Sequence, residues 1–375
     1  MTDKMNNIKR YIDIQLPVTA CTLRCHYCYI TQHQLFSVST PKLKYSAAQI
    51  RKALSKQRLG GVCHISLCGM GETLLLPEIT EIVGGLLEEG HYIMVVTNAT
   101  VTKIIKEMME SYSPELKRRL CFKISYHFLE LKKRNLLEKF FETINYIRQN
   151  GCSFTLELPP SDELIPYIDE VKEYCMKYLG ALCHVTVARD ENVAEYAILT
   201  KLSRDEYKKI WGQFDSQLFD FKIDIFNQKR KEFCYIGKWG GLLNLETGEL
   251  RACDRTFLKQ NIMDDPDAPI DWHPKAKCNK AHCHNGHSWL GLGMIPELKT
   301  PTYSSMRDRV DKNGNHWLQP EMREFLSHKL AEENEQLPAI EKAKAYSSAL
   351  LSNMVWNGYH KLLATVDKCL KSEKR

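Results

Sequence analysis

Short apolar runs alternate with longer stretches of helical spacing from residue 11 to about residue 215. Nearly continuous apolar runs are typical of parallel strands that are buried on both faces. The runs predicted as strands are residues 11–18, 63–68, 92–98, 121–128, 153–158 and 183–188. The stretches predicted as helices are residues 47–59, 77–89, 103–111, 135–149 and 164–179. This alternation predicts an α/β fold with a parallel sheet.

Six strand-and-helix units are too few for a closed eight-stranded barrel. We therefore expect residues 1–220 to form an open, partial (β/α)6 TIM-like barrel. The alternation of predicted strands and helices ends at about residue 220, so residues 221–300 are predicted to be a small cysteine-rich domain. Helical texture returns in residues 301–375, with predicted helices at 321–335 and 339–370.

Composition indicates the cellular compartment of the protein and the kinds of ligand it binds. No run of eighteen apolar residues and no secretory signal is present, so we expect a cytoplasmic protein with no membrane span and no disulfides. The net charge is +6, and the basic residues occur in short clusters, which do not predict a nucleic-acid groove. The chain nevertheless has 14 cysteines, and in a reducing compartment this number indicates metal or redox chemistry.

Three cysteines directly follow the first predicted strand. Cys21, Cys25 and Cys28 have the spacing Cys-x3-Cys-x2-Cys, in a loop where β/α proteins form active sites. Three thiolates can bind three irons of one cubane cluster and leave the fourth iron open for another ligand. The alternative is a zinc site with His26, although that histidine is adjacent to a cysteine ligand.

This cysteine loop, with Tyr27 before its third cysteine, resembles the signature of the radical S-adenosylmethionine (SAM) superfamily. The resemblance implies that Cys21, Cys25 and Cys28 hold a [4Fe–4S] cluster whose open iron chelates SAM. In that family the cluster reductively cleaves SAM to a 5′-deoxyadenosyl radical, which abstracts a hydrogen atom from the substrate. Tyr27 would lie near the adenine.

The resemblance continues at the ends of the next strands. Residues 68–73 resemble the family's Gly-Gly-Glu-Pro segment, with a threonine in place of the proline. They would place Gly69 and Gly71 close to SAM and let Glu72 accept a hydrogen bond from its ammonium group. Residues 96–100, which include Asn98, resemble a Thr-Asn-Gly-Thr segment of the cofactor site, and Ser125 falls at a position that often contacts the ribose.

Strand alternation predicts which side chains line the barrel. Polar residues share one face of the fourth, fifth and sixth strands, and the candidates are Lys123, His127, Glu157 and His184. We interpret them as the wall of a solvated cavity for SAM and substrate, with His127, Glu157 and His184 as candidate catalytic residues. The alternative is that each is a core or rim group with internal partners.

A second cysteine cluster follows residue 220. Its members are Cys234, Cys253, Cys278 and Cys283. A predicted hairpin of residues 239–245 and 249–252 would bring the first two together. The spacing resembles the auxiliary-cluster extension called twitch or SPASM, which implies a second [4Fe–4S] cluster that aids electron transfer. Zinc is the alternative, because three histidines share the same loop: His282, His284 and His287.

The leading hypothesis is a radical SAM enzyme of oxidoreductase or maturase type. The expected net reaction is oxidation or rearrangement of a small molecule or peptide, with electrons from a flavodoxin- or ferredoxin-like partner. About ten residues precede the first strand, which favours substrates other than leader-guided peptides. The alternative hypothesis is a non-enzymatic iron–sulfur or zinc module that senses redox state.

Overall fold

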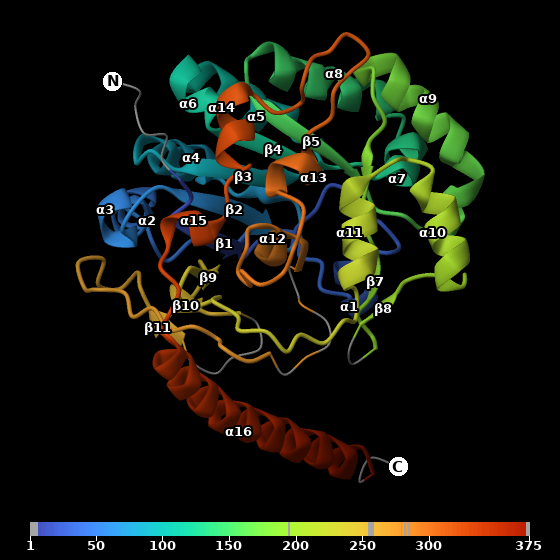
Figure 1. Cartoon of the computed structure of the whole chain (residues 1–375). Helices are drawn as coiled ribbons and strands as arrows, with labels where there is room; N and C mark the ends of the chain where they lie inside the picture. Colours follow the sequence, from blue (N-terminus) through green and yellow to red (C-terminus); the bar gives the residue numbers. More distant parts are fainter. Residues whose placement is uncertain are drawn as a thin grey trace.

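A central β-sheet organises the protein (Figure 1). The computed structural model describes residues 7–193, 196–253, 259–278, 280, 283 and 286–372. Within these residues one sheet has nine strands, in the order β11-β10-β9-β1-β2-β3-β4-β5-β6, and a small sheet pairs β7 with β8. The strands are β1 Arg10–Leu16, β2 Cys63–Gly69, β3 Tyr92–Thr97, β4 Leu120–Ser125, β5 Ser153–Leu158, β6 His184–Val185, β7 Arg189–Asp190, β8 Ala197–Ile198, β9 Gly240–Asn244, β10 Glu249–Arg251 and β11 Lys259–Asn261.

Strands β1 to β6 are parallel neighbours in chain order, which confirms the predicted α/β fold with a partial TIM-like barrel. Two predicted strands were too long. β4 ends at Ser125 because Phe128 already begins a helix, for which His127 is the N-terminal cap. β6 contains only His184 and Val185.

The described helices follow the strands. They are α1 Tyr29–His33, α2 Ala47–Ala53, α3 Lys56–Leu59, α4 Ile79–Glu88, α5 Thr102–Ser111, α6 Pro114–Arg118, α7 Phe128–Lys133, α8 Leu137–Gln149, α9 Ile168–Leu179, α10 Arg204–Gly212, α11 Gln217–Ile225, α12 Gly286–Gly291, α13 Tyr303–Arg307, α14 Pro320–Phe325, α15 Leu330–Glu333 and α16 Ala339–Ser372. The helix predicted over residues 47–59 is split, because Ser55 starts a new helix by accepting a hydrogen bond from the amide of Arg58. A turn of 3-10 helix at Thr73–Leu75 follows β2, and another at Asp162–Tyr167 precedes α9.

The two faces of the sheet pack into different hydrophobic cores, as strand alternation predicts. On β4, Phe122 and Ile124 pack in the core that includes the outer helices α4, α5, α8 and α9. Cys121, on the opposite face, packs in a second core with Tyr303 and Leu318 of the C-terminal segment. The alternation therefore assigned the faces of this strand correctly.

The predicted hairpin is present and extends the barrel sheet. β9 and β10 are antiparallel, with Asn244 opposite Glu249. β9 also pairs in parallel with β1, from Tyr11 opposite Gly240 to Gln15 opposite Asn244. β1 is thus hydrogen-bonded on both edges, and it joins the first part of the chain to the cysteine-rich part.

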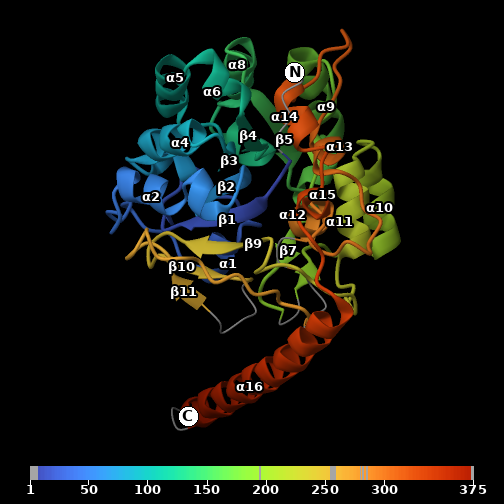
Figure 2. The ribbon, with the colours of Figure 1, turned by 60° about the vertical axis from the view of Figure 1, so that its left-hand side comes forward.

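The C-terminal segment covers the concave face of the sheet. Figure 2 shows helices α2, α4 and α5 on one side of the strands and α11 to α15 on the other. Arg307 and Trp317 are at most 1% exposed, and they lie against residues of β5 and β6. The prediction that Glu157 and His184 line a solvated cavity is therefore wrong: they are 3% and 2% exposed beneath this segment.

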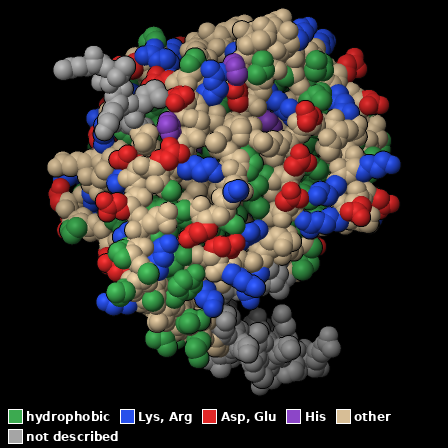
Figure 3. Space-filling model, in the orientation of Figure 1, with side chains coloured by type: hydrophobic (Ala, Val, Ile, Leu, Met, Phe, Trp, Pro, Cys, Tyr) green, Lys and Arg blue, Asp and Glu red, His purple; other side chains and the backbone are tan. Residues whose placement is uncertain are grey.

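Helix α16 leaves the body of the protein, as Figures 1 and 2 show, and it confirms the helix predicted over residues 339–370. Hydrophobic side chains gather over its first half in Figure 3. Ile340, Leu351 and Met354 are between 67% and 72% exposed there. No helix in the described part of the chain is long and apolar enough to cross a membrane.

The ion pair between Arg307 and Glu157 predicts a large effect on stability. Arg307→Met leaves a buried carboxylate with only Lys123, at 3.6 Å, to compensate its charge. We expect the free energy of unfolding, measured by urea denaturation, to fall by about 3–5 kcal/mol. Arg118→Met is the control, because Arg118 forms a half-exposed pair with Glu321, and it should cost about 1 kcal/mol or less. Equal losses in the two variants would contradict this account.

Candidate functional site

The three cysteines lie on a loop between β1 and α1. Cys28 is the N-terminal cap of α1, and its amide donates to the carbonyl of Cys25 at 3.2 Å. The hydroxyl of Thr31 donates to the same carbonyl at 2.7 Å. The guanidinium of Arg24 donates to the carbonyl of Cys21 at 2.5 Å. These bonds curl the loop, so that three sulfurs interact with one another at the C-terminal end of the sheet.

The surroundings of these thiols disfavour uncompensated thiolates. Burial raises the pKa of Cys21, Cys25 and Cys28, and for the first two a neighbouring cysteine raises it further. Three thiolates so close together need positive charge for compensation, and iron supplies it. Among the described residues, no three His, Cys, Asp or Glu side chains are placed to hold a single metal ion. In a cubane cluster, by contrast, each thiolate binds a different iron.

The Gly-x-Gly-Glu segment at the end of β2 is hydrogen-bonded to this loop. The amide of Gly71 donates to the carbonyl of Val18 at 2.5 Å, and the amide of Glu72 donates to that of Ala20 at 2.9 Å. A Cβ atom on Gly71 would lie 2.0 Å from the Ala20 oxygen. Only glycine fits at this position, because the two backbones approach so closely.

The Glu72 carboxylate is buried and accepts hydrogen bonds from three groups of the protein. It is 1% exposed and accepts hydrogen bonds from Thr97 Oγ1 at 2.5 Å, the Asn98 amide at 2.7 Å and the Leu74 amide at 3.1 Å. Burial raises the pKa of Glu72, and the three donors oppose that rise. Glu72 thus ties the end of β2 to the end of β3, while its predicted bond to the SAM ammonium stays a prediction.

Asn98 stands behind the cysteine loop at the end of β3. Its side-chain nitrogen lies 2.9 Å from Thr22 Oγ1 and 3.7 Å from Cys21 Sγ. Its side-chain oxygen accepts hydrogen bonds from the amide and hydroxyl of Thr100. Asn98 therefore orients the first cysteine, and a donor near a ligating sulfur also adjusts the potential of an iron–sulfur cluster.

Tyr27 and His127 are neighbours. The Tyr27 hydroxyl and His127 Nδ1 are 2.7 Å apart, and burial lowers the pKa of His127 to about 4, so the imidazole is neutral at pH 7. Ser125, at the end of β4, lies opposite Glu157 in the sheet. The predicted contacts of Tyr27 with adenine and of Ser125 with ribose stay predictions.

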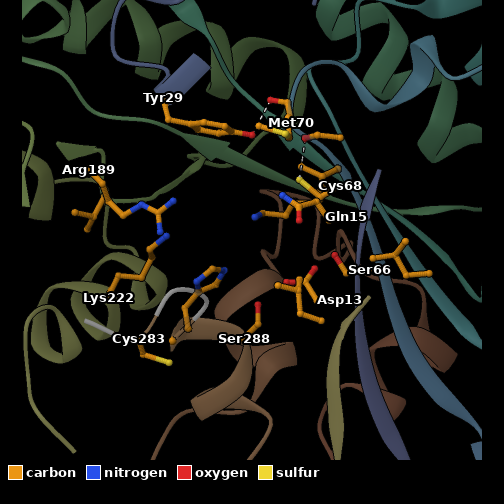
Figure 4. A pocket seen from close by; sticks show the side chains of 18 of the residues that line it. Asp13, Gln15, Tyr29, Ser66, Cys68, Met70, Arg189, Lys222, Cys283 and Ser288 are labelled. Carbon is orange, nitrogen blue, oxygen red and sulfur yellow. Dashed lines mark hydrogen bonds between the residues drawn. The ribbon is translucent and has the colours of Figure 1, made fainter. Parts of the chain in front are cut away.

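A cavity of about 540 Å³ opens beside the cysteine loop, over the concave face of the sheet (Figure 4). Gly69 and Met70 line it, and Tyr29 of α1 fixes the wall by donating a hydrogen bond to the Met70 carbonyl at 2.7 Å. A volume of this size is in the usual range for small-molecule sites. The glycine segment therefore connects the cavity wall to the cysteine loop, while the three thiols themselves are not on that wall.

The cavity wall differs from the one predicted by sequence. Lys123 lines it as predicted, but His127, Glu157 and His184 do not. His184 instead packs against Trp317, and burial lowers its pKa to about 3. The catalytic roles of these three residues stay predictions that the cavity does not support.

Several cavity residues were missed by the sequence analysis. They are Asp13, Gln15, Ser66, Arg189, Lys222 and Ser288. Asp13 and Gln15 had a signal, because they alternate with three buried apolar residues along β1. Arg189 and Lys222 lie after the sixth strand and on α11, where periodicity gives no indication of a shared site.

The second cysteine cluster is partly assembled. Cys234 and Ala276 exchange two backbone hydrogen bonds of 2.9 Å, and burial raises the pKa of Cys234, which the neighbouring Cys278 and Cys253 raise further. Cys283 lines the cavity, and its carbonyl accepts the amide hydrogen of Gly286 at the start of α12.

Of the three histidines considered as zinc ligands, His282 and His284 lie outside the described residues. His287 is on α12 and lines the cavity.

Comparisons with known proteins agree with this geometry. Residues 16–160, less than half of the chain, match the model of the Radical SAM superfamily. This stretch includes the three cysteines, the Gly-x-Gly-Glu segment and Asn98. No curated protein is significantly similar to the chain.

A solved structure shares the fold. SuiB from Streptococcus suis, bound to S-adenosylmethionine, aligns with a TM-score of 0.50 and 14% identity over 69% of this chain. The alignment covers 64% of SuiB, which is less than two thirds of its length. A histidine-tagged anSMEcpe with bound AdoMet aligns over 96% of both chains, with a TM-score of 0.46 and 15% identity.

The close approach at Gly71 predicts that a methyl group there displaces the cysteine loop. Gly71→Ala is expected to lose the irons that this loop would hold, about four per chain, after anaerobic reconstitution, measured by iron analysis per chain. Gly212→Ala is the control, because a Cβ at that position has no atom within 4 Å. Full iron content in Gly71→Ala would show that this contact does not position the loop.

Proposed function

We propose that this protein is a radical SAM enzyme of oxidoreductase or maturase type. The observation that carries the proposal is the joint placement of three thiols and a Gly-x-Gly loop beside one cavity, at the C-terminal end of a partial barrel. The match of residues 16–160 to the Radical SAM superfamily supports it. A redox sensor would need thiols but no polar cavity next to them, so the cavity favours an enzyme.

Cys21, Cys25 and Cys28 would hold a [4Fe–4S] cluster. They fit this group because they share one partly buried loop, interact electrostatically, and supply one ligand fewer than a cubane has irons. Leu23, which is 1% exposed, anchors the loop in the hydrophobic core.

SAM would bind in the cavity, at the end that borders the cysteine loop. The backbone at Gly69 and Met70 lies on the wall there, and Cys68 Sγ is turned back to the Gly69 carbonyl at 3.3 Å. When both groups are bound, the cluster would supply the electron that splits SAM into methionine and a 5′-deoxyadenosyl radical. The chain's own contribution is to hold SAM against one iron and to keep water away from the concave face, where Tyr11 and Tyr303 are 1% exposed.

We further propose that Cys234, Cys253, Cys278 and Cys283 hold an auxiliary [4Fe–4S] cluster. The supporting observation is the electrostatic interaction among the first three. Cys283 lies at the cavity wall, so a cluster with this ligand would be close to the substrate. An electron could then pass between the substrate and the auxiliary cluster during a net oxidation.

The substrate would be a compact small molecule or a single side chain of a peptide, because SAM and substrate share a cavity of about 540 Å³. The electron for the first cluster would come from a flavodoxin- or ferredoxin-like partner.

The first cluster predicts a direct test by mutation. Cys25→Ala removes one of three iron ligands, so reconstituted protein with SAM and dithionite should form no 5′-deoxyadenosine above background, measured by chromatography. Cys152→Ala removes a thiol from the outer core, where its sulfur contacts Met109, and should retain activity. Unchanged 5′-deoxyadenosine formation in Cys25→Ala would rule out the proposed cluster.

The auxiliary cluster predicts a change in iron content. Wild-type protein should hold about eight irons per chain, and a Cys234→Ala, Cys253→Ala double variant should hold about four. A Cys175→Ala variant, which alters a buried cysteine of α9, should match the wild type. Bound zinc, or equal iron content in the wild type and the double variant, would contradict the auxiliary cluster.

A further inference from the structure

The cavity beside the cysteine loop has an excess of positive charge. Its positively charged side chains are Lys123, Arg189, Lys222 and Arg251, and its negatively charged ones are Asp13 and Glu191. Four cations thus face two carboxylates in a partly enclosed cavity, where unbalanced charge is more costly than in open water.

Three of the cations gather at one side. Lys123 comes from β4, Arg189 from β7 and Lys222 from α11, and each lysine is repelled by Arg189. Figure 4 shows Arg189 and Lys222 next to each other, with Asp13 and Ser66 across the cavity. Burial, followed by the charges of Arg307 and Arg189, lowers the pKa of Lys123 to about 8. Burial, followed by the charges of Lys123 and Arg189, lowers the pKa of Lys222 well below its usual value.

The chain balances these charges incompletely. Arg189 pairs with Glu191, with 2.9 Å between guanidinium and carboxylate, so the incomplete balance lies at the two lysines. Glu157 lies 3.6 Å from the Lys123 ammonium, but the same carboxylate also pairs with Arg307. The Lys222 ammonium donates to a neutral hydroxyl, Thr186 Oγ1, at 2.5 Å. An anion seated here would restore the charged form of both lysines, since an opposite charge favours protonation.

SAM does not provide this balance. It carries a sulfonium and an ammonium group against one carboxylate, so its binding adds one positive charge to the cavity. A negative charge placed directly against Lys123 and Lys222 would come with the other ligand of the cavity, which is the substrate.

We propose that the substrate carries an oxyanion, a carboxylate or a phosphate group, which binds between Lys123, Arg189 and Lys222. This inference rests on the proposed function and adds the chemical class of the substrate. The anion would fix the substrate at the α11 side of the cavity and direct its remaining part toward the cysteine loop.

Equilibrium dialysis of the anaerobically reconstituted, SAM-loaded protein tests the inference. The probes are radiolabelled inorganic phosphate and acetate, each in buffer free of other oxyanions. We expect about one probe anion to be retained per chain. Tighter binding of phosphate would identify a phosphorylated substrate, and tighter binding of acetate a carboxylate.

Variants of Lys222 test the location. Lys222→Met should weaken anion binding at least about tenfold, as expected for the loss of a charge-assisted hydrogen bond, whereas Lys222→Arg should retain it. Lys209→Met is the matched control, because Lys209 is exposed on the neighbouring helix α10. Melting curves verify that each variant is folded.

Three results would overturn the inference. The first is a wild type that retains neither anion, and the second is a Lys222→Met variant that binds as tightly as the wild type. The third is displacement of SAM by phosphate, which would assign the cations to the carboxylate of SAM itself. Each differs from a failure of the proposed function, which is the absence of SAM cleavage.

Discussion

Two backbone hydrogen bonds hold the loop of three cysteines against the end of β2, and the rest of the site depends on them. They run from the Gly71 amide to Val18 and from the Glu72 amide to Ala20. The Glu72 carboxylate extends the connection to Thr97 and the Asn98 amide at the end of β3. The ends of three successive strands are thereby joined into one rigid unit. A cluster that must present one iron to a second ligand needs this kind of preorganisation.

The C-terminal segment gives this site its enclosure. An open sheet of six parallel strands leaves a concave face that water could reach, and α12 to α15 cover it (Figure 2). Arg307 occupies the part of the face near Glu157 of β5, and the cavity lies between β1 to β4 on one side and Arg189 and Lys222 on the other. β9 adds to β1 and brings Leu242 to the same cavity. Residues from every third of the chain therefore shape one space.

Much of this arrangement follows from local sequence. The apolar runs located all six parallel strands, because a strand buried on both faces must be apolar along its length. The three cysteines and the Gly-x-Gly-Glu segment were found because each directly follows a strand. The solvated lumen was predicted incorrectly at Glu157 and His184, because nothing near them in sequence indicates that Arg307 and Trp317 pack there. Arg189 and Lys222 were missed for the same reason: only the tertiary fold brings them to Lys123.

The central claim is that the cluster held by Cys21, Cys25 and Cys28 keeps one iron open for SAM. Electron–nuclear double resonance on the reduced cluster measures this directly, with SAM that carries nitrogen-15 in its amino group. The account predicts a hyperfine coupling to nitrogen-15 that appears when labelled SAM is added and disappears when unlabelled SAM replaces it. A cluster spectrum that SAM leaves unchanged, with no such coupling, would contradict it.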